Sequence, residues 1–81
     1  MSAFNGLSLY IQRNYSGSIN GTDTNQRLSS IRKIINRFLI ENNLPCDKKQ
    51  RNGIYCKNSE TAQKHFSLFA NWCKFNLVSK C

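Results

Sequence analysis

The strongest constraint on the fold is a periodic run of apolar residues in the middle of the chain. Large aliphatic and aromatic side chains recur there at i, i+3, i+6, i+7, i+10 and i+11, namely Leu28, Ile31, Ile34, Ile35, Phe38 and Leu39. Because an α-helix turns once every ~3.6 residues, this spacing gathers them into one stripe. Asp23 or Thr22 can cap the start, and Pro45 prevents continuation past the end. The run predicts a helix from about Thr24 to Asn42.

A second amphipathic pattern occupies the C-terminal part of the chain. Its core line consists of Ala62, Phe66, Phe69 and Cys73, broadened by Ala70, Trp72 and Leu77. Polar residues fall on the opposite face, namely Lys64, Ser67, Asn71 and Lys74. With Ser59 as a suitable N-cap, the pattern predicts one continuous helix from about Glu60 to Leu77.

The N-terminal segment, residues 3–15, fits two structures. Four of its apolar side chains have helical spacing: Phe4, Leu7, Ile11 and Tyr15. Leu7, Leu9 and Ile11 also alternate with other residues as in a strand, but no second clear strand follows to pair with it. A helix is therefore favoured for this segment.

Loops separate the three expected helices. Residues 16–22 contain the turn signal Asn20–Gly21, which between two strands would mark a hairpin. Residues 44–58 form a long connection, and Asn52–Gly53 allows a short hairpin across Lys49 to Cys56. The expected fold is one all-α domain, residues 1–81, with three helices and a long basic connection between the second and third. An α+β fold with a short N-terminal hairpin is the alternative.

Positive charge is the most distinctive feature of the composition. Twelve Lys and Arg residues against four Asp and Glu give a net charge of +8 in 81 residues. Such a field attracts polyanions, of which nucleic acid is the most common inside cells, ahead of acidic protein surfaces and anionic membranes. The same charges would only solvate the surface if they did not converge in space.

The candidate nucleic-acid-binding residues lie on the second helix and in the connection. They are Arg27, Arg32, Lys33, Arg37, Lys48, Lys49, Arg51, Tyr55 and Lys57. The Lys and Arg side chains suit phosphate groups, and the tyrosine ring is suited to stack on an exposed base. A ring packed over the helices is an equally good interpretation of the tyrosine.

Catalytic patterns are missing from the sequence. His65 is the sole histidine, and no motif pairs it with a nucleophile and an orienting acid. The four acids stand near helix ends or in loops, where capping explains them: Asp23, Glu41, Asp47 and Glu60. The four glycines are scattered and form no phosphate-binding loop. We therefore expect a non-enzymatic protein without catalytic residues or a cofactor.

The four cysteines leave three states open. Cys46, Cys56, Cys73 and Cys81 lack the C-x2–4-C spacing of zinc sites, and the sequence has no secretory signal pattern that would favour disulfides. Free thiols are favoured, while disulfides, or zinc with His65 as an alternative ligand, stay open. No apolar run reaches the ~20 residues of a membrane span. The expected location is the cytoplasm, of the producing cell or of a host.

These features predict a small basic nucleic-acid-binding protein, such as a phage or mobile-element regulator. The alternative is a protein-binding inhibitor or adaptor that meets an acidic surface, for example a phage protein that disables a host enzyme or defence complex. A disulfide-stapled secreted effector is a third hypothesis. The sequence does not distinguish DNA from RNA, and it leaves the oligomeric state open.

Overall fold

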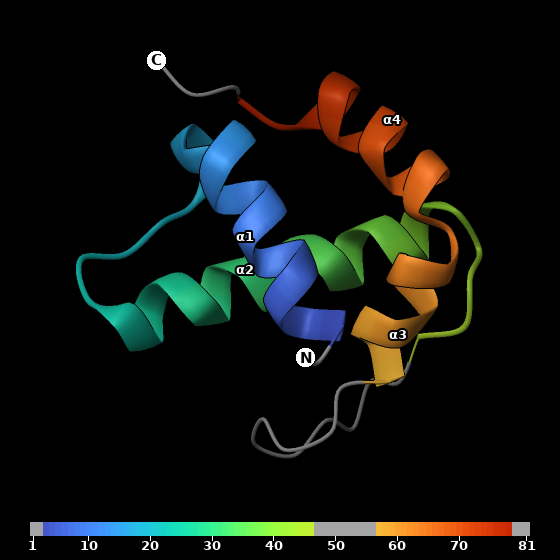
Figure 1. Cartoon of the computed structure of the whole chain (residues 1–81), viewed down its shortest axis with the longest axis horizontal. Helices are drawn as coiled ribbons and strands as arrows, with labels where there is room; N and C mark the ends of the chain where they lie inside the picture. The colour runs from blue at the N-terminus through green and yellow to red at the C-terminus, as the bar shows by residue number, and fades with distance from the viewer. Residues whose placement is uncertain (1–2, 47–56, 79–81) are drawn as a thin grey trace.

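The computed structural model describes residues 3–46 and 57–78. These residues form four α-helices, a short 3-10 helix and no strand. The elements are α1 (Ala3–Asn14), η1 (Ser16–Ser18), α2 (Thr24–Glu41), α3 (Lys57–Lys64) and α4 (Phe66–Asn76). Figure 1 shows α1 crossing α2, with α3 and α4 following one another along one side of the pair. The predominantly helical prediction is confirmed, and the N-terminal hairpin is wrong for the described residues.

Helix α2 forms where the apolar periodicity predicts it, because both of its ends are capped. Asp23 Oδ1 accepts a hydrogen bond from the Gln26 amide at 2.8 Å, which satisfies one of the free donors of the first turn. At the other end, Asn43 adopts a positive φ of 57° and the Leu44 amide donates to Leu39 O at 2.9 Å. This is the Schellman arrangement, in which a left-handed residue returns the chain onto the last turn.

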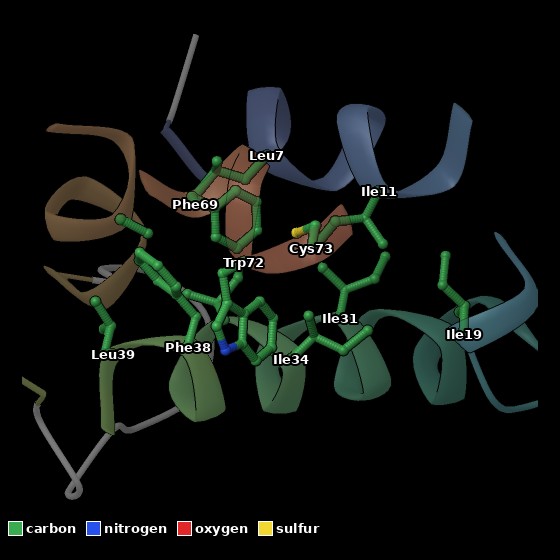
Figure 2. Close-up of a cluster of buried hydrophobic side chains, with 12 residues drawn as sticks. Leu7, Ile11, Ile19, Ile31, Ile34, Phe38, Leu39, Phe69, Trp72 and Cys73 are labelled. Carbon is green, nitrogen blue, oxygen red and sulfur yellow. The ribbon is translucent and has the colours of Figure 1, made fainter. Parts of the chain in front are cut away.

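The core lies between α1, α2 and α4, with α3 closing one end. Its buried apolar side chains are Leu7, Ile11, Ile19, Ile31, Ile34, Ile35, Phe38, Leu39, Ala62, Phe69, Trp72 and Cys73. Figure 2 shows α1 above and α2 below a layer filled by Phe69, Trp72 and Cys73 of α4. Phe38 meets the other two rings edge to face, with centroid distances of 5.0 Å to Phe69 and 5.6 Å to Trp72. The predicted stripe of α2 is thus the floor of the core.

The prediction of one continuous C-terminal helix is wrong, because the helix breaks at His65. The His65 ring Nδ1 lies 3.0 Å from Thr61 O, and since a carbonyl only accepts, the ring nitrogen is the donor. The backbone amide of His65 bonds instead to Ala62 O at 3.1 Å, one residue short of the α-helical pattern. The side chain therefore replaces a main-chain bond and allows α4 to leave in a new direction.

The break also changes which residues of this segment are buried. Phe66 is 41% exposed, although the sequence places it on the core line, whereas Phe69 and Cys73 are fully buried as predicted. Ser59, the predicted N-cap, lies inside α3, which begins at Lys57, and is itself fully buried. Packing of the first turn of α3 against α2 thus overrides the local capping preference.

The loop between α1 and α2 is anchored at two points. Ile19 packs into the core, and Gly21 adopts a φ of +115°, as a turn residue of this kind can. A Cβ at this glycine would lie 2.5 Å from Gln26 Cβ, so the turn excludes a side chain there. The Val78 amide donates to Ser18 Oγ at 2.6 Å, which holds the end of α4 against this loop.

Candidate nucleic-acid interface

The four candidate cations of α2 do not share one face of the helix. Arg32 and Arg37 are five residues apart, which separates them by about 140° around the axis. Lys33 and Arg37, at i and i+4, lie on the outward face and are both exposed. Arg27 and Arg32 are half-buried on the two flanks. The structure therefore presents Lys33 and Arg37 together and holds the other two at the edges.

Arg37 belongs to a cluster that joins α2 to α4. Its Nε donates to Glu41 Oε2 at 2.7 Å, and its guanidinium lies 5.5 Å from the centre of the Trp72 ring. Trp72 Nε1 donates to the other oxygen of the same carboxylate at 3.1 Å. The hydrogen bond from Arg37, and then that from Trp72, lower the pKa of Glu41. The charge of Arg37 is thus partly compensated within the protein.

Arg32 is positioned by an aromatic ring on the opposite flank. Its guanidinium carbon lies 5.2 Å from the centre of the Phe4 ring of α1. A guanidinium over a ring face is favoured by about 0.5–1 kcal/mol at exposed sites, and the contact limits the orientations of the side chain. Its donors remain available at the rim of the α1–α2 contact.

Lys57, the last cation of the predicted basic connection, is exposed and begins α3. Its neighbour Asn58 is buried, and Asn58 Nδ2 donates to Asn36 Oδ1 of α2 at 2.8 Å. Asn36 lies one helical turn from Arg32 and Lys33. This hydrogen bond therefore holds the start of α3 against the stretch of α2 that carries those two cations.

The remaining candidates, Lys48, Lys49, Arg51 and Tyr55, lie outside the described residues. The structure also presents three cations that the sequence-based set omitted, namely Arg13, Lys64 and Lys74, all of which are exposed. Among residues 3–46 and 57–78, the single salt bridge is that of Arg37 and Glu41. Seven of the eight described Lys and Arg side chains therefore have no acidic partner within that part of the chain.

A groove that the sequence did not indicate lies between α1 and the α3–α4 junction. It has a volume of about 660 Å³ and is lined by Gly6, Leu7, Leu9, Tyr10, Arg13, Asn14, Gln63 and Phe66. The ring of Phe66 meets that of Tyr10 edge to face at 5.1 Å. Burial, and then a hydrogen bond with Tyr15, raise the pKa of Tyr10 to about 12, so its hydroxyl stays neutral. Phe66 is the one aromatic residue of α4 that lines this groove. The apolar periodicity of the sequence placed it in the core, so the sequence did not indicate the groove.

The thiols and the histidine have structural surroundings. Cys46 and Cys73 are free, whereas Cys56 and Cys81 lie outside the described residues. Burial raises the pKa of the Cys73 thiol to about 12, which keeps it protonated and unreactive. Asn58 Nδ2 also approaches Cys46 Sγ at 3.6 Å. Among the described residues, no group of His, Cys, Asp and Glu side chains is arranged to hold a metal ion.

The comparisons add no relative from which a role could be transferred. No protein-family model, curated protein or solved structure matches this chain. None of the helices in the described part of the chain has the length and apolar character needed to cross a membrane. The functional argument therefore depends on the geometry and charge of the chain itself.

Proposed function

We propose that the protein is a non-enzymatic nucleic-acid-binding protein that contacts phosphate groups with cations of α2 and the start of α3. The observation that carries this proposal is the Asn58–Asn36 hydrogen bond, because it joins the end of one basic segment to the middle of the other. Lys57 is then held close to the stretch of α2 that carries Arg32 and Lys33. Convergence of the two segments is what separates a binding surface from a merely solvated one.

The low number of internal ion pairs supports the same proposal. A net charge of +8 repels itself, and acidic neighbours would relieve this repulsion. Two of the three described acids make contacts elsewhere: Asp23 caps α2, and Glu41 binds Arg37 and Trp72. The third, Glu60, is exposed in the first turn of α3 and forms no salt bridge within the described residues. A bound polyanion would compensate the remaining cations and release its own counterions, which makes affinity depend steeply on salt.

The test is binding to labelled duplex DNA, single-stranded DNA and RNA across a salt series. We expect micromolar or tighter binding at physiological salt. Lys33→Ala combined with Lys57→Ala should weaken binding and reduce the slope of log K against log salt by about 0.7–0.9 per lost contact. Lys74→Ala is the matched control for Lys33→Ala, because each change removes one exposed lysine from a helix. If only the net charge matters, Lys33→Ala and Lys74→Ala should lower the affinity equally. The proposed surface predicts a larger loss of affinity for Lys33→Ala.

An acidic protein surface is the second candidate, and one observation favours it. Phe75 is 82% exposed on α4, with Leu68, one heptad earlier on the same helix, 41% exposed. Apolar side chains beside cations are also typical of a protein interface. If none of the three nucleic acids binds at physiological salt, the nucleic-acid proposal is wrong. Capture of an acidic partner that Phe75→Ala abolishes would then assign the function to a protein inhibitor or adaptor.

A further inference from the structure

The groove between α1 and the α3–α4 junction has the chemistry of a base-binding site. We infer that it holds an unpaired base of a single-stranded nucleic acid, an inference that rests on the proposed function and specifies its ligand. The volume of about 660 Å³ falls within the roughly 300–1,000 Å³ of small-molecule sites. Its wall carries apolar, amide and cationic groups, and each of these matches one part of a nucleotide.

The apolar part of the wall suits the flat face of a base. Phe66 and Leu9 are 41% and 44% exposed, while Tyr10 packs against Phe66 in an edge-to-face contact. A half-exposed ring of this kind can stack on a base of any sequence, since every base has a π face. The rings are held from behind by the core, because Tyr10 and Phe66 both contact Phe69.

The polar part of the wall suits the edge of a base and its phosphate. Gln63 and Asn14 contribute amides, and an amide offers both a donor and an acceptor, as the pairing edge of a base requires. Asn14 Nδ2 already donates to Tyr10 O at 3.0 Å, which fixes its orientation in the groove. Arg13 supplies the cation for a phosphate, and none of the described residues that line the groove is acidic.

Charge selects this occupant over a second copy of the chain. A second copy carries the same +8 and would be repelled. An acidic peptide satisfies the charge as well, but the combination of an exposed ring with two amides matches a base more closely than an acidic side chain. Helix α3 links the groove to the proposed phosphate surface. Lys57 begins α3 and Gln63 stands near its end, about 9 Å away along the axis and about 120° around it. A strand that contacts both residues would therefore follow the side of α3.

The experiment compares three ligands of equal length at one salt concentration. They are a single-stranded oligonucleotide, the same strand with its bases replaced by abasic sites, and the corresponding duplex. We expect the base-containing strand to bind about 5- to 160-fold more tightly than the abasic strand, the range expected for one stacked base. The duplex, whose bases are paired, should not show this gain.

Gly6 provides a position at which a larger side chain can narrow the groove. It lines the groove within α1, and a Cβ at this position would meet nothing within 4 Å. Gly6→Leu should remove the advantage of the base-containing strand and leave binding of the abasic strand unchanged. Gly6→Ala is the matched control, since a single methyl group leaves most of the groove open. Thermal unfolding of both variants verifies that they are folded.

The outcomes separate the two proposals. Full retention of the base-dependent gain in Gly6→Leu would overturn the base site, as would equal binding of base-containing and abasic strands by the unmodified protein. In both cases a steep salt dependence would leave the phosphate surface standing. Absence of binding to all three ligands would reject the nucleic-acid function and the base site together. An acidic peptide that binds, and loses its affinity in Gly6→Leu, would assign the groove to a protein partner.

Discussion

Two groups of aromatic side chains in this protein have the same chemistry and different surroundings. The inner group, Phe38, Phe69 and Trp72, lies between α2 and α4 and is almost completely buried. The outer group, Tyr10 and Phe66, makes the same edge-to-face contact at 5.1 Å, yet Phe66 remains 41% exposed. Phe66 and Phe69 both lie on α4, and their rings are 6.4 Å apart. Phe66 is the first residue of the helix, directly after the break at His65, and Phe69 lies nearly one turn further into the core. Burial assigns the inner rings to stability and leaves the outer rings available for binding.

The largest expected effect is on the inner group. Phe69→Ala should lower the free energy of unfolding by about 3–5 kcal/mol, because it removes a fully buried ring and leaves a cavity. Urea unfolding followed by circular dichroism measures this loss. Phe66→Ala is the paired control, and it should cost only about 1 kcal/mol, since much of that ring already contacts water. Equal losses for the two variants would show that the groups do not differ in the way the structure indicates.

The second prediction uses pH to compare Cys73, which is buried in the same core as the inner group, with Tyr10 of the outer group. The unfolded Cys73 thiol ionises near its ordinary pKa of 9.0, whereas burial holds the folded thiol protonated until about 12. The folded state therefore binds this proton more tightly, and the stability that results is complete below pH 9 and declines as pH rises toward 12. For Tyr10 the corresponding window begins near 10.0 and ends near 12.

Thermal unfolding midpoints measured from neutral to alkaline pH test whether the contribution of Cys73 begins to decline at a lower pH than that of Tyr10. Cys73→Ala should flatten the part of the decline that begins near pH 9 and keep the later part, to which Tyr10 contributes. An unchanged profile in Cys73→Ala would mean that the thiol does not contribute through its burial. Tyr10→Phe should instead flatten the later part of the decline and keep the part that begins near pH 9.

A smaller effect is expected from the floor of the groove. Gly6→Ala should raise the free energy of unfolding by about 0.5–1 kcal/mol, because alanine loses less backbone entropy within a helix and the new methyl group meets no atom. Gly21→Ala is the control with the opposite sign, since its φ of +115° and the nearby Gln26 exclude a side chain. Chemical denaturation of both variants checks the pair. A loss of stability in Gly6→Ala would show that the groove is less open than described.

The smallest effect concerns the surface ion pair beside the inner group. The bonds from Arg37 and Trp72 lower the pKa of Glu41, so the stability they provide is present above its unfolded pKa of 4.5 and is lost as pH falls through the folded value. Exposure and salt screening keep this contribution small. Glu41→Gln should therefore reduce the acid dependence of the thermal midpoint slightly. An unchanged acid limb would indicate that the carboxylate is fully solvated.

The sequence predicted correctly those parts of the fold that depend on residues close together in the chain. The bounds of α2 follow from its apolar spacing, the cap at Asp23 and the turn before Pro45. The break at His65 has no glycine or proline to announce it, and it depends on a side chain that bonds to Thr61 O. The start of α3 depends on Asn58 reaching Asn36, a contact across 22 positions. Periodicity carries no information about such contacts.

The candidate site divides in the same way. Composition and position in the sequence were enough to name Lys33 and Lys57 as candidates. They could not show which cations of the two segments lie together, because that depends on how α3 packs against α2. The groove was beyond reach for the same reason, because Tyr10 and Gln63 come from helices far apart in the chain. Arg13 was omitted since it stands outside the two basic segments.

The hydrogen bond between Ser18 and Val78 spans 60 positions, and it has a consequence for synthesis. Phe69, Trp72 and Cys73 cover the stripe of α2, so the first two helices leave the ribosome without their cover. At ~5–20 residues per second, the interval between Phe38 and Phe69 is roughly 2–6 s. During that time the nascent chain displays an uncovered apolar surface, which favours aggregation. Among the described helices α4 is the last to be synthesised, so a chain truncated before α4 keeps this surface exposed.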